Sequence, residues 1–225
     1  MLKTFALFDF DGTLLPGDSI ILFMRYAWRK KLCSALDLLR FAVAGLLFSL
    51  RMIPPERAKE MGLNFLNGRE RAEYSAAAEE FCRTMILPRL YPQGVEAIRR
   101  HRDARHAVLL VSASPMFYLE PLKKLLGFTE VIGTRFATDK NGRFADEIVG
   151  QNCRGEQKVK RIQEYLDETG TQLDYETSYA YGDNPHDLPM LSLCEHKYVV
   201  NPNKMMREML GSHDGVTMLD WKEKP

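Results

Sequence analysis

The sequence predicts an α/β fold, a doubly wound parallel sheet with an all-helical segment inserted after the first strand. Short apolar runs that alternate with helical patterns support the parallel sheet. A long stretch with almost no strand signal, residues 20–87, supports the insertion. Two carboxylates, Asp9 and Asp11, directly follow the first apolar run. Open α/β sheets bind ligands at the carboxyl ends of their strands, so we expect the chemistry there.

The predicted elements alternate in chain order. Strands are expected where short apolar or aromatic runs are bounded by polar or turn residues, at residues 4–8, 107–111, 178–181 and 197–200. Helices are expected where apolar residues recur at helical spacing, at residues 95–102, 118–126 and 156–168. Gly170 follows the last helix as a stop signal. Asn141-Gly142, within residues 134–148, predicts a β-hairpin.

The helical insertion divides the predicted organisation. Residues 1–15 and 88–225 would form the catalytic core, and residues 16–87 a helical cap over the strand ends. Prolines and glycines separate the helices of the cap, at Pro54, Pro55, Gly62 and Gly68, and Pro88 follows its end.

Charge balance, cysteine spacing and the N-terminal sequence indicate which partners and which cell compartment to expect. The 225 residues carry 31 basic and 30 acidic side chains, a net charge of +1, which argues against nucleic acid as the main partner. The four cysteines form no Cys-x-x-Cys pair, so we expect reduced, mostly buried thiols. No signal-peptide pattern is visible, and we expect a cytoplasmic protein.

Residues suited to catalysis stand at four places, three of them after predicted strands and one in the first turn of a predicted helix. Asp9-Phe-Asp11-Gly-Thr follows the first strand, and Ser112-Ala113-Ser114 follows the second. Lys158 stands in the first turn of a helix, where a cation opposes the helix dipole. Tyr181-Gly-Asp183-Asn-Pro-His-Asp187 adds two more carboxylates. Hard oxygen ligands beside a lysine and an anion-binding turn suit Mg²⁺ and phosphoryl transfer.

This ordered set resembles the motifs of the haloacid dehalogenase superfamily. The helical insertion, Gly-Glu-Gln-Lys158 and Gly-Asp-Asn-Pro-His-Asp187 resemble its phosphoserine-phosphatase-like branch. The resemblance covers residues 7–201. It implies a Rossmann-like core and a Mg²⁺-dependent phosphatase that acts through an aspartyl-phosphate.

The resemblance also implies roles at individual positions. Asp9 would be the nucleophile, and Asp11 would protonate the leaving alkoxide and then activate water. Ser112 and Ala113 would bind the phosphoryl group. Lys158 would neutralise charge and orient Asp9.

Further roles concern the metal. Asp9, Asp183 and the backbone carbonyl of Asp11 would ligate Mg²⁺. Asp187 would hold Lys158 and metal-bound water, and Asn184 would shape the loop. An acid at position 11 favours a phosphatase over relatives that retain the phosphoryl group or displace halide.

Four positions depart from the phosphoserine phosphatases. Ala113-Ser114 stands in place of Gly-Gly, Asp18 in place of a Glu that grips the substrate, and His186 in place of Asn. Asp18 and His186 are therefore candidate substrate contacts. Asp18 is equally a helix N-terminal capping residue, and His186 a solvated loop residue. We interpret the other histidines, His101, His106, His196 and His213, as ordinary surface residues.

The apolar run from Leu32 to Leu50 has three interpretations. It could be buried in the cap, form a homodimer, or make peripheral contact with a membrane among nearby arginines and lysines. Its uncharged part is too short to span a bilayer. The substrate could accordingly be a soluble phosphomonoester or a lipid phosphate at a membrane surface. A phosphotransferase and a non-catalytic phosphate-binding module are further alternatives.

Overall fold

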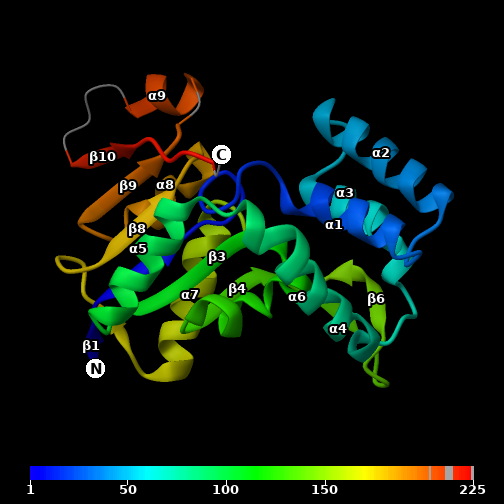
Figure 1. Ribbon diagram of the computed structural model, residues 1–225, viewed down its shortest axis with the longest axis horizontal. Coiled ribbons are helices and arrows are strands. Elements are labelled where there is room, and N and C mark those ends of the chain that lie inside the picture. The colour runs from blue at the N-terminus through cyan, green and yellow to red at the C-terminus, as the bar shows by residue number, and fades with distance from the viewer. Residues whose placement is uncertain (203, 211–214, 224–225) are drawn as a thin grey trace.

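A computed structural model describes residues 1–202, 204–210 and 215–223 and contains a parallel sheet with helices on both faces (Figure 1). The strand order is β10-β9-β8-β2-β3-β4, and every neighbouring pair is parallel. The bounds are β2 (Phe5–Phe8), β3 (Ala107–Pro115), β4 (Glu130–Thr134), β8 (Tyr179–Gly182), β9 (His196–Val200) and β10 (Val216–Leu219). The predicted α/β class and all four predicted strands are confirmed, whereas β4 and β10 were not predicted.

The central strand β2 is buried on both faces. Ala6 and Phe8 pack with α5 (Pro92–Asp103), while Phe5 and Leu7 pack with α7 (Glu156–Thr169). A strand covered on both sides reads as a continuous apolar run, which is how residues 5–8 read. From β2 the chain builds β3 and β4 on one side and later crosses over to build β8, β9 and β10 on the other. The strand order therefore switches direction beside β2, at whose end Asp9 lies.

Two of the three predicted core helices form as single helices. They are α5 and α7, and α7 ends at Gly170 with a left-handed φ of 61°. The predicted helix at 118–126 is wrong in its continuity. The structure has a short α6 (Met116–Leu119) and then a π-helical turn, η4 (Lys123–Gly127). Pro121 lies between them, and proline cannot donate the hydrogen bond that a continuous helix needs there.

The segment 16–87, which we call the cap, contains helices and no strand along its fully described length. The helices are α1 (Ser19–Arg29), α2 (Ala35–Ser49), α3 (Pro55–Gly62), α4 (Arg71–Phe81), and the short turns η1 (Asn64–Leu66) and η2 (Cys82–Ile86). The prediction of an all-helical insertion is confirmed. The interpretation that the Leu32–Leu50 run is buried in the cap does not hold for α2, because Ala44 is its one fully buried residue.

Smaller elements complete the fold. The predicted hairpin is confirmed as antiparallel β5 (Phe136–Thr138) and β6 (Phe144–Ile148), with Gly142 at a φ of 76° in its turn. The others are β1 (Leu2–Lys3), which pairs with β7 (Gln172–Leu173), η3 (Leu87–Arg89), η5 (Pro185–Asp187), α8 (Leu188–Leu191) and α9 (Lys204–Leu210). All four cysteines are free and buried, as predicted.

Candidate active site

Asp9 lies where β2 ends, held by three elements. Its backbone N–H donates to the Tyr181 carbonyl of β8 at 2.9 Å. One carboxylate oxygen accepts from Lys158 at 2.5 Å, and the other lies 3.1 Å from the Thr13 hydroxyl. Asp9 is buried, so these partners stabilise a carboxylate that would otherwise be costly to desolvate.

The contacts of Lys158 account for a cation at the N-terminus of a helix. Although it stands in the first turn of α7, its ammonium group turns into the core and bonds Asp9 and also Asp187, at 2.7 Å. Its side chain is 2% exposed. Burial alone would lower the pKa of Lys158, but Asp187 and Asp9 together hold it above its ordinary value. The lysine is therefore a fixed positive charge.

Asp183 and Asp187 come from the loop after β8. Asp187 accepts from the backbone N–H groups of Asp183 and Asn184, each at 3.2 Å. Asp183 lies 3.1 Å from the Thr13 hydroxyl and packs on Gly12 so closely that a Cβ there would overlap its carboxylate. Gly12 also has a φ of 88°, so the turn after Asp11 needs glycine for two independent reasons.

The acids at this edge of the sheet, two buried and one half-buried, fit a divalent cation. Asp9, Asp183 and Asp187 each offer an oxygen, and the three oxygens lie within 4.8 Å of one another. Lys158 alone does not balance three carboxylates. Burial, and then repulsion from Asp187, raises the pKa of Asp9 well above its ordinary value and that of Asp183 to about 7. A hard cation with oxygen ligands would remove this repulsion, and Mg²⁺ is such an ion.

The Asp11 carboxylate lies outside this acidic cluster, in a network of hydroxyl groups. It accepts from the Ser19 backbone N–H at 2.6 Å and from the Ser114 hydroxyl at 2.5 Å. Tyr118 continues the network, 3.0 Å from the Ser19 hydroxyl. Burial raises the pKa of Asp11 to about 6. The two acids of the first motif thus have separate environments, which suits separate chemical roles.

The second motif meets the cap through a side chain that sequence reasoning missed. Ser112 is buried and its hydroxyl accepts from the Ser114 N–H at 3.0 Å. The Ala113 carbonyl accepts from Lys59 of α3 at 2.7 Å and from Thr134 at 2.6 Å.

Lys59 also donates to the Asn152 side chain at 2.6 Å. Burial lowers the pKa of Lys59 to about 8. Nothing in the sequence around Lys59 distinguishes it from an ordinary helix-surface lysine, because its burial arises only when α3 meets the core.

The remaining candidates lie at the edge of the site. Asp18 is exposed and accepts from the Ile20 N–H at 2.9 Å, which confirms the helix-capping interpretation. The Asn184 side chain accepts from the His186 N–H at 3.1 Å and so shapes the loop, while His186 itself is exposed.

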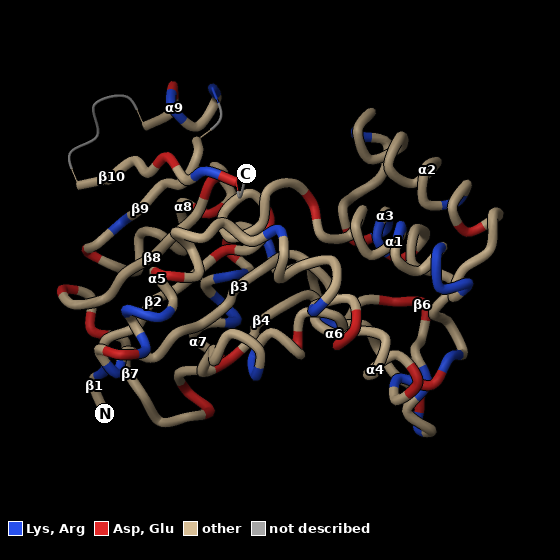
Figure 2. The backbone as a smooth tube through the Cα atoms, in the orientation of Figure 1, with Lys and Arg blue, Asp and Glu red and all other residues tan. Residues whose placement is uncertain are grey.

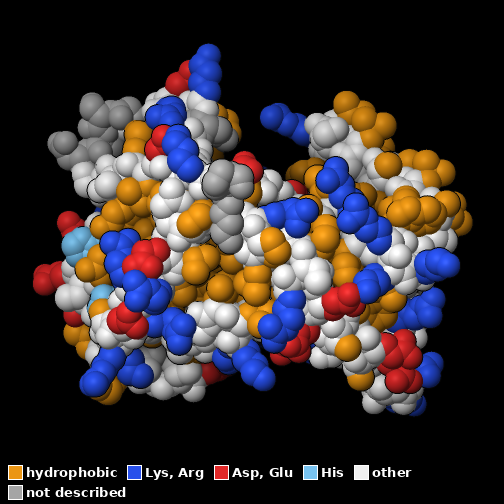
Figure 3. Space-filling model, viewed as in Figure 1, with side chains coloured by type: hydrophobic (Ala, Val, Ile, Leu, Met, Phe, Trp, Pro, Cys, Tyr) orange, Lys and Arg blue, Asp and Glu red, His pale blue; other side chains and the backbone are white. Residues whose placement is uncertain are grey.

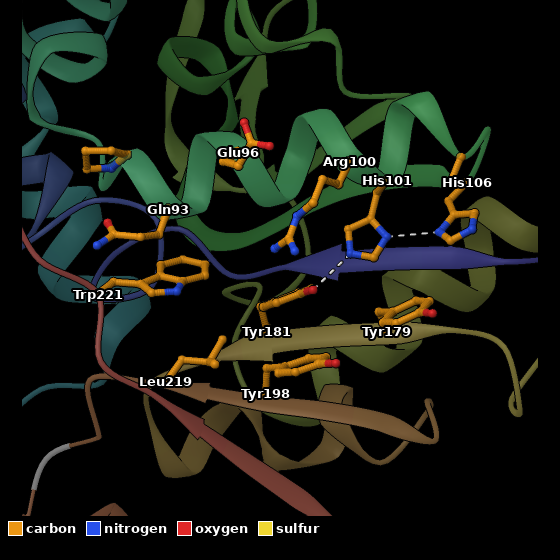
Figure 4. A pocket seen from close by; sticks show the side chains of 12 residues that line it. Gln93, Glu96, Arg100, His101, His106, Tyr179, Tyr181, Tyr198, Leu219 and Trp221 are labelled. Carbon is orange, nitrogen blue, oxygen red and sulfur yellow. Dashed lines mark hydrogen bonds between the residues drawn. The ribbon is translucent and has the colours of Figure 1, made fainter.

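A cavity of about 910 Å³ lies away from the acidic cluster, between α5 and the faces of β8, β9 and β10 (Figure 4). On its wall, His106 bonds His101 at 2.9 Å, and His101 bonds the Tyr181 hydroxyl at 2.9 Å. The surface interpretation of His101 is therefore wrong, because this residue of α5 is buried against the sheet. His196 is exposed as predicted, and His213 lies outside the described residues. The chain of hydrogen bonds fixes Tyr181, whose carbonyl receives the N–H of Asp9.

No helix in the described ranges is long and apolar enough to cross a membrane. The acidic cluster, Lys158 and the hydroxyl network lie together at the carboxyl edge of the sheet, where α3 and the start of α1 contact them.

Comparisons with known proteins show the family of the chain. A model of the haloacid dehalogenase-like hydrolase family matches residues 6–192. The histidinol-phosphatase of Neisseria meningitidis serogroup C is 28% identical over 235 residues, covering 98% of this chain and 100% of that protein. Phosphoserine phosphatase SerB1 of Mycobacterium tuberculosis is 30% identical over 210 residues, 91% of this chain and 67% of that protein. A crystal structure of a protein of unknown function from Bordetella pertussis Tohama I has a TM-score of 0.87 and 28% identity, covering 98% of this chain and 99% of that one.

Proposed function

Because the chain belongs to the haloacid dehalogenase-like hydrolase family, we propose that it is a Mg²⁺-dependent phosphatase that hydrolyses a phosphomonoester through a phosphoryl intermediate on Asp9. Membership of the family confirms the predicted enzyme class, a hydrolase. The observation that supports the finer proposal is the pairing of a cation-held nucleophile, Asp9, with a second acid, Asp11, in a separate hydrogen-bond network.

In the first step, an Asp9 oxygen attacks phosphorus and the ester P–O bond breaks. Asp11, in its protonated form, gives its proton to the leaving alkoxide, which departs as an alcohol. A pKa of about 6 leaves Asp11 able to carry that proton near neutral pH. Lys158 and the Ser112 hydroxyl bind the phosphoryl oxygens or hold Asp9 while negative charge accumulates.

In the second step, Asp11 takes a proton from water, and the oxygen of that water attacks phosphorus. The bond between phosphorus and Asp9 breaks, inorganic phosphate leaves, and both acids return to their starting states. Asp9, Asp183 and the Asp11 carbonyl would hold Mg²⁺, with Asp187 beside them. Bound Mg²⁺ supplies charge neutralisation at the phosphoryl oxygens.

The substrate class we propose is a small phosphomonoester. Two of the relatives are named histidinol-phosphatase and phosphoserine phosphatase, names that denote hydrolysis of phosphate esters of small amino compounds. The histidinol-phosphatase is matched along its full length, so we place histidinol phosphate first in the substrate panel. No feature of the site favours a phosphotransferase or a non-catalytic module.

The test is phosphate release from a panel of phosphomonoesters, with and without Mg²⁺, by wild type and by Asp9→Asn. The panel holds histidinol phosphate, phosphoserine, sugar phosphates and lipid phosphates in micelles. We expect Asp9→Asn to lose activity by about 10⁴-fold or more, since removing a nucleophile abolishes covalent catalysis. Asp146→Asn, an exposed acid of β6, is the matched control and should keep full activity.

A second measurement tests the intermediate. Quenched wild-type enzyme should carry a hydroxylamine-sensitive phosphoryl group on the peptide that contains Asp9. Phosphate release by a clean Asp9→Asn preparation at the wild-type rate would overturn the proposal, as would labelling at another residue.

A further inference from the structure

An apolar stripe lies exposed along α2. Its members are Leu36, Leu39, Val43, Leu46 and Leu50, each between 41% and 59% exposed. They recur at intervals of three and four residues, so they share one side of the helix. The other side carries Leu38 and Phe41, which pack on the core of the cap. Figure 3 shows the apolar side chains gathered over α2 at the end of the molecule.

Positive charge surrounds this stripe. Residues 20–53 contain six basic side chains and one acid, a net charge of +5, whereas the rest of the chain has 25 basic and 29 acidic residues, a net charge of −4. Figure 2 shows Lys and Arg positions where α1 and α2 end. Lys30 pairs with Glu80 and Arg40 lies near Asp37. Within the described ranges the other four, Arg25, Arg29, Lys31 and Arg51, form no ion pair.

Two of these cations occupy strained positions. Lys31 and Arg51 follow the ends of α1 and α2 with left-handed φ values of 57° and 58°. Glycine is the usual residue at such a position because a side chain is disfavoured there. The fold would be at least as stable with glycine at either site, so folding does not account for the side-chain charge.

We propose that the α2 face, the five apolar residues together with Lys31 and Arg51, rests on an anionic lipid surface. Apolar side chains would enter the headgroup region while the cations attract anionic lipids. A second copy fits less well, because it would bring two segments of charge +5 together. With 15 residues α2 is about 22 Å long, shorter than the hydrocarbon core, so it would lie on the bilayer and not span it.

The test is sedimentation of the full chain with vesicles of phosphatidylcholine alone or with phosphatidylglycerol added. We expect binding to the anionic vesicles, at least tenfold weaker binding to the neutral ones, and loss of binding as salt rises. The assay needs no turnover, so its result is independent of the proposed phosphatase activity.

Two sets of variants separate the apolar and charged contributions. Leu39→Gln with Leu46→Gln should abolish vesicle binding, since it removes the centre of the stripe. Lys31→Gly and Arg51→Gly should each weaken binding about fivefold. Each glycine variant should unfold at the same urea concentration as wild type or a higher one.

The chain offers a matched control. Arg105 follows α5 with a left-handed φ of 61° and lies outside the α2 face. Arg105→Gly therefore makes the same backbone change and the same loss of charge elsewhere, and should leave vesicle binding unchanged. Equal effects of Arg105→Gly and Arg51→Gly would contradict the proposal.

Light scattering without vesicles tests the rival occupant. A stable dimer that Leu39→Gln with Leu46→Gln dissociates would overturn the proposal in favour of a second copy. Equal sedimentation with anionic and neutral vesicles, or none with either, would also overturn it.

Discussion

The carboxyl edge of the sheet and the α2 face differ in whether their charged groups have partners. At the sheet edge, the buried charges each have partners in the described structure: Lys158 bonds two acids, and Asp11 accepts from two serines. On the α2 face, apolar carbons meet solvent, and Lys31 and Arg51 have no acidic partner within the described ranges. The partners at the sheet edge offset the cost of burying charged groups, so the folded state depends on them. The arrangement on the α2 face gives the isolated chain no stability, and it is the one that needs a partner from outside.

The largest expected effect on stability comes from removing Lys158, the central cation of the sheet edge. Lys158→Met leaves Asp9 and Asp187 buried without their shared ion pair. We expect the free energy of unfolding to fall by about 3–5 kcal/mol, measured in urea at pH 7. Mg²⁺ should restore part of the loss, because it would take over the role of the cation.

Lys160→Met is the control for that experiment. Lys160 is exposed on the same helix, and its loss should change stability by no more than about 0.5 kcal/mol. A similar fall in both variants would show that the sheet edge does not depend on Lys158.

A smaller effect on stability is expected from His101 of α5, which should make the free energy of unfolding depend on pH. Burial lowers the pKa of His101 to about 4, below the ordinary 6.5. Between these values the unfolded chain binds a proton that the folded chain does not, so this contribution to stability is lost as pH falls from 6.5 to 4.

Relative to His101→Gln, wild type should therefore lose up to about 3 kcal/mol of unfolding free energy over that range, measured in urea at several pH values. The exposed His196→Gln variant should show no such trend against wild type. A pH-independent difference between wild type and His101→Gln would mean that folding does not change the pKa of His101.

The smallest predicted effect on stability concerns Lys59, at the contact between the cap and the core. Lys59→Met removes two hydrogen bonds, but Thr134 still reaches both acceptors, the Ala113 carbonyl and Asn152. We expect a loss of about 1 kcal/mol of unfolding free energy in urea. Arg57→Met, exposed on the same helix, should have no measurable effect. A loss above 3 kcal/mol for Lys59→Met would show that Thr134 does not compensate.

Residues whose role depends on a strand end could be predicted from the sequence. Asp9, Ser112 and Asp183 follow apolar runs, and parallel strands bring their ends to one edge whatever the details of packing. Strands β4 and β10 were missed because their runs, Glu-Val-Ile-Gly-Thr and Val-Thr-Met-Leu, are short and carry weak signals.

Residues whose role depends on packing between distant elements could not be predicted. Lys59 and Asn152 meet across 93 positions, and His101 and Tyr181 across 80. Helical periodicity indicates which side chains share a face, but not whether a neighbour covers that face. The same limit left open whether the residues of α2 are buried, and the structure shows that Ala44 is its one fully buried residue.

The hairpin of β5 and β6 has a mechanical consequence for the cap. Three backbone hydrogen bonds join it to the cap: Gly68 to Phe144, Phe144 to Arg69, and Arg71 to Gly142. The cap is thus fastened at the hairpin as well as by its two covalent connections to the core. A cap that swings open must either break these bonds or carry the hairpin with it. In the second case the pivots include residues 134–135 and 149–152, and the moving body is built from two segments that the sequence separates.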